Sequence, residues 1–422
     1  MRVAIVSTSD ARGGAAVAAH RLADALCREG VEATMVVARA DSGATASPGG
    51  NGAAVVVAGT PWQRRWAFLW ERLRIFVANG LRRRGLWDVD IANAGVDITQ
   101  TEAFRRADIV HLHWVNQGFL SLGGLRRIVG SGKPVVWTMH DMWPCTAICH
   151  HAGECGAYER RCHTCPQLLR PGADDLAARV FGRKQDIYSM AKLHFVAVSE
   201  WMACRARRSA LTAGHDICVI PNALPMELFH PTDRLAARRR FGIAATDRVV
   251  AFGAARIDQP LKGFGTLVDA LRIMAQRLGN DARLHLLLFG SVKDRRVLDN
   301  LPCSVTWVGM VGDVATLCDV YSAADVLASA SDYETFGQTI VEAMACGCVA
   351  VSFDRGGQTD IISHRRDGYL ARQGDTNDLA NGLWWALQSP PAPQVLRQSV
   401  ASRFSGEAVA QSHIELYKRL LA

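Results

Sequence analysis

The sequence has no long uninterrupted hydrophobic run. A membrane-spanning helix needs about 18 consecutive apolar residues, and charged residues or glycines interrupt every candidate stretch. The opening residues MRVAIVSTSD also lack the basic segment, apolar segment and small-residue cleavage site of a secretory signal. We therefore expect a cytoplasmic protein that does not span a bilayer.

Cysteine is too scarce for a disulfide scaffold. The chain has 12 cysteines in 422 residues, and the cytosol keeps thiols reduced. Five of them nevertheless fall within residues 145–165, in an insertion of about residues 141–170. Four thiols there could hold a structural Zn²⁺ tetrahedrally, namely Cys149, Cys155, Cys162 and Cys165. Their spacing is not a common zinc pattern, so reduced, packed cysteines are the alternative.

Net charge is also scarce outside one segment. The net charge is +8, and residues 62–84 contribute +6 of it, with seven arginines against one glutamate. The rest of the chain carries only +2 and no nucleic-acid motif, so we expect no nucleic-acid partner. Five aromatic residues lie among these arginines: Trp62, Trp66, Phe68, Trp70 and Phe76. Such a segment suits peripheral contact with the cytoplasmic face of an anionic membrane, or a helix that buries its aromatic face and solvates its arginines.

Apolar, β-branched runs alternate with amphipathic stretches along the whole chain. This pattern predicts an α/β protein with two doubly wound, Rossmann-like parallel sheets. The predicted strands are 3–8, 34–38, 109–112, 134–139, 194–198 and 217–220, followed by 248–253, 283–289, 304–308, 325–328 and 349–353. Prolines at 221, 225 and 231 break the pattern, so we place a domain boundary between residues 222 and 223. The Gly/Ser/Ala-rich stretch 41–52 is predicted to be a loop.

Ligands of doubly wound sheets bind at the carboxyl ends of the strands, which predicts a cleft where the two sheets face each other. In the first half, Gly13 and Gly14 follow the first strand and could let a ligand approach the backbone. His113 ends strand 109–112, and His140 with Asp141 ends strand 134–139. Alternatively, these residues have structural roles only. The glycines would then form a tight turn, and the histidine rings would hydrogen-bond to the backbone.

In the second half, Arg256 and Lys262 lie six residues apart, after a strand and before a helix. Two cations at the carboxyl edge of a sheet suit a diphosphate, because arginine binds phosphate bidentately and lysine acts as a point charge. A solvated surface pair is the alternative.

The segment SASDYETFGQTIVEAMACGCVAV follows a later strand and opens a helix. Glu342 lies inside that helix, where a carboxylate could accept both hydroxyls of a ribose. Glu334 precedes the helix and could reach a sugar ring. We expect the helix start to contribute to the same site through Phe336, Gly337, Gln338 and Thr339. Surface carboxylates beside a helix start are the alternative.

Taken together, these motifs resemble glycosyltransferase family 4, the retaining transferases with the two-domain GT-B fold, over nearly the whole chain. Arg256 and Lys262 look like the family's diphosphate pair, Glu334 and Glu342 like its E-x7-E motif, and Gly14 like part of its glycine loop. The segments HLHWVNQGFLSL and RGGQTDII and the cysteine-rich stretch are similar to the branch of colanic-acid and other exopolysaccharide transferases.

The resemblance implies a hexosyltransferase that moves a sugar from a nucleotide diphosphate sugar to a saccharide or polyprenyl-linked saccharide, with retention and with no metal required. It implies an acceptor domain at 1–222 and a donor domain at 223–404, with a terminal helix in 405–422 that packs back on the first domain. His113 would lie near the transferred sugar, and His140 would bind acceptor or donor hydroxyls. Alternatives are an epimerase or a phosphorylase of similar fold, or a non-catalytic sugar-binding relative.

Overall fold

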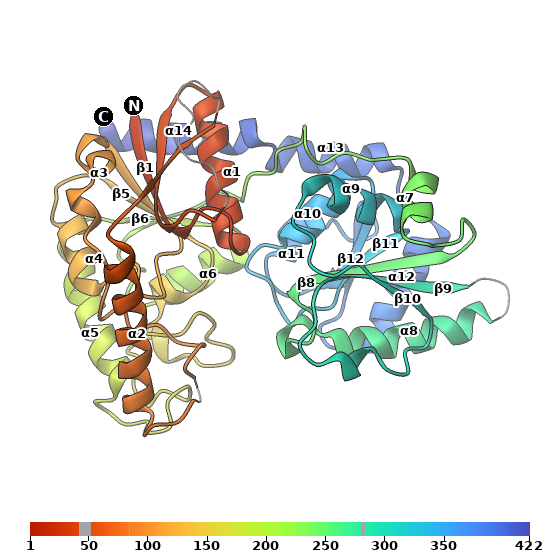
Figure 1. Ribbon diagram of the computed structural model, residues 1–422, viewed down its shortest axis with the longest axis horizontal. Helices are drawn as coiled ribbons and strands as arrows, with labels where there is room; N and C mark the ends of the chain where they lie inside the picture. The colour runs from red at the N-terminus through yellow and green to blue at the C-terminus, as the bar shows by residue number, and fades with distance from the viewer. Residues whose placement is uncertain (42–51, 84, 280–282) are drawn as a thin grey trace. The chain divides into compact units, whose positions relative to one another are not determined.

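A computed structural model describes residues 1–41, 52–83, 85–279 and 283–422. The chain divides into two compact units (Figure 1): unit 1 is Met1–Ala223 with Val409–Ala422, and unit 2 is Leu224–Ala408. The predicted boundary between residues 222 and 223 lies one residue from this division. Most of the predicted loop 41–52, and Arg84 of the arginine-rich segment, lie outside the described residues.

Unit 1 is built on a seven-stranded parallel sheet in the order β3-β2-β1-β4-β5-β6-β7. Its strands are β1 Arg2–Ser9, β2 Glu32–Arg39, β3 Ala54–Val57, β4 Ile109–Leu112, β5 Val135–Met139, β6 His194–Ala197 and β7 Asp216–Val219. The six predicted strands are present, and β3 is additional. Sequence patterning missed β3 because it is a short edge strand whose residues are only partly buried.

Helices cover both faces of this sheet. They are α1 Gly14–Arg28, α2 Pro61–Ala78, α3 Glu102–Arg106, α4 Leu122–Val129, α5 Leu176–Tyr188, α6 Glu200–Arg208 and α14 Gly406–Leu421. On one face, α1 and α14 share a core cluster with β1, in which Tyr417 packs with Val3 and Ile5. The C-terminal helix therefore returns to unit 1, which is the packing expected for residues 405–422.

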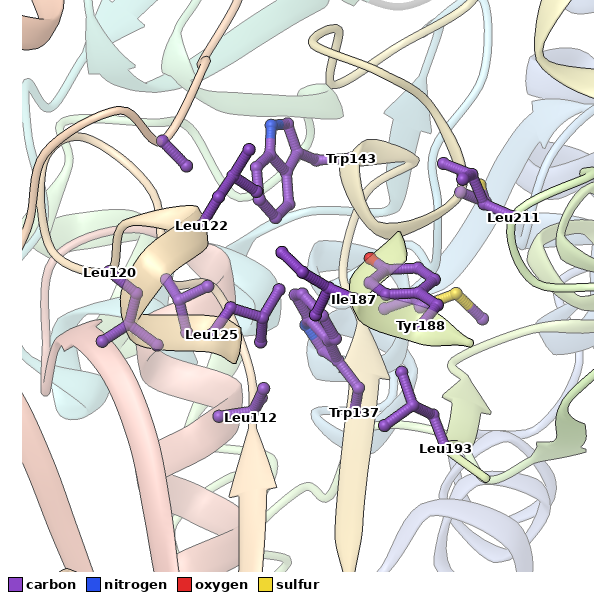
Figure 2. Close-up of a cluster of buried hydrophobic side chains, with 14 of the residues drawn as sticks. Leu112, Leu120, Leu122, Leu125, Trp137, Trp143, Ile187, Tyr188, Leu193 and Leu211 are labelled. Atoms are coloured by element: carbon purple, nitrogen blue, oxygen red, sulfur yellow. The ribbon is translucent and has the colours of Figure 1, made fainter. Parts of the chain in front are cut away.

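The other face of the sheet carries a second core, to which α2, α4, α5 and α6 contribute. Figure 2 shows Trp137 of β5 among Leu125 of α4 and Ile187 and Tyr188 of α5. Trp137 and Trp143 are both almost fully buried, at 1% and 2% exposure. Such large buried aromatic side chains contribute strongly to the stability of unit 1.

Unit 2 has a six-stranded parallel sheet in the order β10-β9-β8-β11-β12-β13. Its strands are β8 Arg248–Arg256, β9 Leu284–Ser291, β10 Ser304–Trp307, β11 Val326–Ser329, β12 Val349–Phe353 and β13 Gly368–Ala371, of which β13 was not predicted. Its helices are α7 Arg234–Arg240, α8 Phe264–Leu278, α9 Val314–Ala323, α10 Gln338–Ala345, α11 Gln358–Ile361, α12 Thr376–Gln388 and α13 Pro393–Phe404. The prediction of two parallel α/β sheets is confirmed.

In each sheet the strand order reverses at one central pair, β1 with β4 in unit 1 and β8 with β11 in unit 2. Loops leaving the carboxyl ends of such a pair run to opposite faces of the sheet and leave a crevice, which is where ligands of these folds bind. The loops after β1, β4, β8 and β11 are therefore the positions that decide the site.

Among the described residues, no helix combines the length and the apolar composition needed to cross a bilayer.

Candidate active site

The loops after β8 and β11 bring Lys262 and Glu334 together. Lys262 ends the short 3-10 helix η4 (Pro260–Lys262), and its Nζ donates to Glu334 Oε1 at 2.7 Å. The same oxygen accepts a hydrogen bond of 2.7 Å from Ser331 Oγ. Both charged side chains are about a quarter exposed. Two residues that the sequence placed on different parts of a ligand are thus direct neighbours.

Arg256 stands at the end of β8 with a separate partner. Its Nε lies 3.8 Å from Asp258 Oδ1, and its side chain is 47% exposed. Asp258 is itself held by backbone N–H groups of Lys293 and Asp294. The guanidinium therefore lies beside a fixed carboxylate and remains half-exposed to solvent, where it is accessible to a charged ligand.

Glycine at 263 is required by the close approach of these two loops. Gly263 has φ +67°, and a Cβ there would lie 1.8 Å from the carbonyl oxygen of Ala330. No side chain fits that space, since real Cβ contacts of less than 3.0 Å do not occur. The backbone after β8 thus packs directly on the backbone after β11.

Three helices at the strand-order reversals begin with a glycine. The N-cap residues of α1, α8 and α10 are Gly13, Gly263 and Gly337, with φ of 96°, 67° and 118°, and none of them supplies a capping side chain. By contrast, α2 and α9 are capped by the side chains of Thr60 and Asp313. The helix dipole and the free N–H groups of a helix start favour negative charge, but among these three caps only Gly13 has no atom within 4 Å of its Cβ position.

The first turn of α10 begins with Gln338 and Thr339, which are both partly buried. Glu342 is only 6% exposed, and Oε2 accepts a hydrogen bond of 3.0 Å from the Tyr321 hydroxyl on α9. Phe336 is also 6% exposed, and its ring meets Phe404 edge-to-face at 5.6 Å. The Phe336 ring therefore packs inside unit 2, so only the backbone of this residue is left for the predicted donor contact.

Sequence reasoning missed the residues that hold Glu334 in place. The Glu334 backbone N–H donates to Gln358 Oε1 at 3.1 Å, and Gly357 N–H donates to the Glu334 carbonyl at 2.7 Å. A Cβ on Gly356 would approach that carbonyl oxygen to 2.7 Å. The segment RGGQTDII contains all three residues, so its two glycines and glutamine were the available signal.

In unit 1, the predicted histidines form a pair. His113 Nδ1 and His140 Nε2 share a hydrogen bond of 2.9 Å, and His113 is 3% exposed. Burial holds the pKa of His113 well below its ordinary value and lowers the pKa of His140 to about 4. Both rings are therefore neutral near pH 7. Within the described part of the chain, His113 Nε2 has no hydrogen-bond partner.

His111 belongs to the same group and was not singled out from the sequence. Its ring lies 4.4 Å from that of His113 between centroids, because alternate residues of β4 share one face of the strand. His111 Nδ1 and the Tyr417 hydroxyl lie 2.6 Å apart, and Nε2 lies 2.7 Å from Thr138 Oγ1. The histidine at the end of β4 is thus linked through its neighbour to α14.

Asp141 has a structural position. It accepts from Trp114 Nε1 at 2.8 Å and from the Trp143 backbone N–H at 2.8 Å, and it pairs with His150 Nδ1 at 2.7 Å. Burial opposes ionisation, but His150 and these hydrogen bonds lower the pKa of Asp141 to about 2. Asp90 pairs with the other nitrogen of His150 at 2.7 Å. Both Asp141 oxygens are thus occupied by the protein, contrary to its prediction as a cleft residue.

At the carboxyl end of β1, Gly13 and Gly14 are exposed. A Cβ on Gly13 would meet no atom within 4 Å, so the space beside this helix start is open. Thr8 Oγ1 lies within hydrogen-bond distance of the carbonyl oxygens of Trp114 and Asn116, which ties the loops after β1 and β4 together.

The four predicted zinc ligands line one small cavity of about 30 Å³. Burial raises the pKa of Cys149 to about 12 and that of Cys162 to about 11, which favours the thiol form. Within the described ranges, no group of three or more histidine, cysteine, aspartate or glutamate side chains is arranged to hold a metal ion. The side-chain positions therefore do not support the zinc prediction, which metal analysis of the purified protein would test.

Two known protein families match most of this chain. Residues 12–228 match the family described as Glycosyltransferase Family 4, and residues 247–389 match the one described as Glycosyl transferases group 1. The chain is 33% identical over 327 residues to a D-inositol 3-phosphate glycosyltransferase of Actinosynnema mirum, which covers 75% of this chain and 71% of that protein.

The chain belongs to glycosyltransferase family 4. It is also 28% identical over 341 residues to the protein of the same name from Jonesia denitrificans, across 76% of this chain and 74% of the other. This family 4 glycosyltransferase therefore matches both a family description and relatives over about three quarters of their length.

Solved structures agree on the fold. Sucrose-phosphate synthase from Thermosynechococcus elongatus superimposes with a TM-score of 0.67 at 21% identity, covering 99% of this chain and 98% of that one. The Anabaena protein Alr3699/HepE, solved with UDP and glucose, gives a TM-score of 0.64 at 18% identity, with 99% of each chain covered. The GT-B fold that the sequence predicted is thereby confirmed.

Proposed function

We propose that this family 4 glycosyltransferase transfers a sugar from a nucleotide diphosphate sugar to a saccharide or polyprenyl-linked saccharide acceptor. The transfer retains the anomeric configuration and requires no metal, and it serves exopolysaccharide or cell-surface polysaccharide synthesis in the manner of the colanic-acid branch. The observation that carries the proposal is the ion pair of Lys262 with Glu334, which joins the loop after β8 to the segment before the start of α10, where the strand order of unit 2 reverses. Arg256 ends β8 on the same side of the reversal.

The reaction breaks the bond between the anomeric carbon and the diphosphate oxygen. Arg256, Lys262 and the first N–H groups of α10 stabilise the negative charge that develops on the diphosphate. The acceptor oxygen forms the new bond on the same face of the sugar and passes its proton to the leaving phosphate. These cations perform the charge stabilisation that a divalent metal performs in other transferases.

Glu334 acts in this scheme as a positioning group for the donor sugar. Its Oε1 is already bonded to Lys262 and Ser331, and its backbone is held by Gln358 and Gly357. A carboxylate held in this way has the fixed geometry needed to bind a hydroxyl. It is not a covalent nucleophile in the proposed mechanism.

His113 and His140 supply neutral hydrogen bonding in unit 1. Since burial keeps both rings uncharged near pH 7, they bind sugar hydroxyls and do not compete for the diphosphate. We place the acceptor in unit 1 and the nucleotide in unit 2. The Anabaena protein solved with UDP and glucose, and its form with UDP-glucose, support a nucleotide sugar as donor.

The test is a thermal-shift titration with UDP, GDP, ADP and dTDP, without added metal. A ligand at 100 times its dissociation constant adds about 2.7 kcal/mol to the stability of the folded state, so one nucleotide should raise the melting temperature. Arg256→Gln should remove this shift. Arg272→Gln, another half-exposed arginine of unit 2, should keep it.

No shift with any nucleotide would contradict the donor site. A shift without turnover on saccharide acceptors would favour the non-catalytic alternative. We also propose a cytoplasmic location, peripheral on the inner face of the membrane, where a polyprenyl-linked acceptor would be presented.

A further inference from the structure

The helix α2 has an unusual distribution of polarity. Its charged residues Glu71 and Arg72 are 0% and 6% exposed, whereas Trp62 and Trp66 are 79% and 57% exposed. A helix on the surface of a globular protein normally turns its apolar side inward. Here the apolar side faces outward, which contradicts the interpretation that the aromatic face is buried and the arginines alone are solvated.

Specific bonds hold the charged side of α2 inward. Glu71 Oε1 accepts from the backbone N–H groups of Ile91 and Ala92 at 2.9 and 2.6 Å. Arg72 pairs with Glu71 Oε2 at 3.2 Å and bonds Asp90. Breaking such a buried ion network leaves uncompensated charge inside the protein, so the helix is not free to rotate about its axis.

The outward residues form a single stripe. At about 100° per residue, they occupy one face roughly opposite the buried residues Ala67, Glu71 and Ile75. The stripe consists of Trp62, Trp66, Leu69, Trp70, Leu73 and Val77, which are all between 37% and 79% exposed. Trp66 and Trp70 stack with ring centroids 5.8 Å apart. A contiguous exposed apolar stripe of this size marks an interaction surface.

Arginines border the stripe on both sides. Arg65 and Arg74 are exposed and flank it on the helix wheel. Arg82 and Arg83 are exposed just beyond the helix, near exposed Leu81. The only acid in residues 62–84 is the buried Glu71. The occupant of this surface must therefore be apolar and negatively charged.

We infer that this tryptophan and arginine face of α2 docks on the surface of an anionic lipid bilayer. Tryptophan rings favour the boundary between headgroups and acyl chains, and arginines favour anionic headgroups. A second copy of the same face would bring two arginine borders together, which disfavours a homodimer. The inference deepens the proposed function and rests on it in one respect, since docking places unit 1 where a lipid-linked acceptor is found.

The experiment is co-sedimentation of the full chain with vesicles, without donor or acceptor. Vesicles of phosphatidylcholine alone are compared with vesicles of phosphatidylcholine and phosphatidylglycerol in equal parts. We expect binding to the anionic vesicles only, and binding that weakens with salt.

Three double variants sharpen the test. Trp62→Ser with Trp66→Ser should lose binding at least tenfold, and their high exposure predicts an unchanged melting temperature. Arg65→Gln with Arg74→Gln should weaken binding about 25-fold, at roughly fivefold for each arginine near an anionic surface. Arg207→Gln with Arg208→Gln removes two exposed arginines of α6 and should leave binding unchanged.

Equal binding to neutral and anionic vesicles would overturn the role of the arginines. No binding by a folded protein would overturn the inference, as would self-association that the tryptophan variants abolish. Each of these outcomes can be distinguished from a failure of the proposed function, because the nucleotide-dependent thermal shift is measured without lipid.

Discussion

The two sheets have the same type of strand-order reversal, but the side chains beside it are charged and partly exposed in unit 2 and neutral and buried in unit 1. In unit 2 the loops after β8 and β11 carry half-exposed or quarter-exposed charges, Arg256, Lys262 and Glu334. In unit 1 the loop after β4 carries His113, a buried and neutral ring paired with His140. The first arrangement suits a ligand with formal charge, and the second suits hydroxyl groups.

The contrast extends to the backbone at the two glycine-capped helices. At Gly263 the neighbouring loop leaves no room for a Cβ, whereas at Gly13 nothing lies within 4 Å. Unit 2 therefore has a tightly packed wall behind its cations, and unit 1 has an open helix start. Similar topology thus supports two different sites because the loops, not the sheets, decide the chemistry.

The largest expected effect is that of Gly263→Ala. The added Cβ would lie 1.8 Å from the Ala330 carbonyl oxygen in a left-handed backbone conformation, so we expect a loss of about 4 kcal/mol. Urea unfolding would measure it. Gly265→Ala, in α8 with open space around it, should change stability by less than about 1 kcal/mol; similar midpoints for the two variants would contradict the close packing of the loops.

Next in size is the effect of Lys262→Met on turnover. Removing a cation that faces developing charge costs about 10²-fold to 10³-fold in kcat. The variant should fold normally, because a partly exposed ion pair with Glu334 contributes only about 1 kcal/mol or less. Steady-state kinetics with Lys293→Met, an exposed lysine of the same unit, provide the control. Equal kcat in the two variants would exclude Lys262 from the charge-stabilising group.

A smaller effect is the pH dependence of stability that the buried His413 gives to unit 1. Burial lowers the pKa of His413 to about 4 from an ordinary 6.5, so below pH 6.5 the unfolded chain binds a proton that the folded chain refuses. The free energy of unfolding therefore falls as the pH drops from 6.5 towards 4, by about 2 kcal/mol at pH 5 for this one group. The rings of His111 and Tyr417 lie beside it.

His413→Phe should reduce the stability difference between pH 7 and pH 5 by that amount in urea unfolding. His230→Phe, at an exposed histidine of unit 2, should leave the difference unchanged. An unaltered pH dependence in His413→Phe would mean that this ring is not held neutral.

The smallest effect belongs to Gly13→Ala. Its φ of 96° strains any side chain, but no atom blocks the Cβ, so we expect a loss of about 1 kcal/mol. Thermal unfolding of Gly13→Ala and Gly263→Ala under the same conditions compares the losses of stability at the two helix starts. A loss as large as that of Gly263→Ala would show that unit 1 is packed as tightly as unit 2.

Local patterning determined much of this protein. The alternation of apolar and amphipathic stretches predicted both parallel sheets, because buried parallel strands read as continuous β-branched runs. Charged and glycine residues placed just after strands predicted the carboxyl-end loops, and the prolines at 221, 225 and 231 located the division between the units to within one residue. The edge strand β3 was not predicted, because its four residues are partly exposed and therefore show only a weak hydrophobic pattern.

The tertiary structure alone decided which side chains meet. Spacing could not show that Lys262 and Glu334 share a hydrogen bond, that Asp141 is enclosed by His150 and Trp114, or that α2 turns its tryptophans outward. Sequence records the order of residues along one element. Partners that are 72 residues apart, like Lys262 and Glu334, are brought together only when the strands of a sheet take their places side by side.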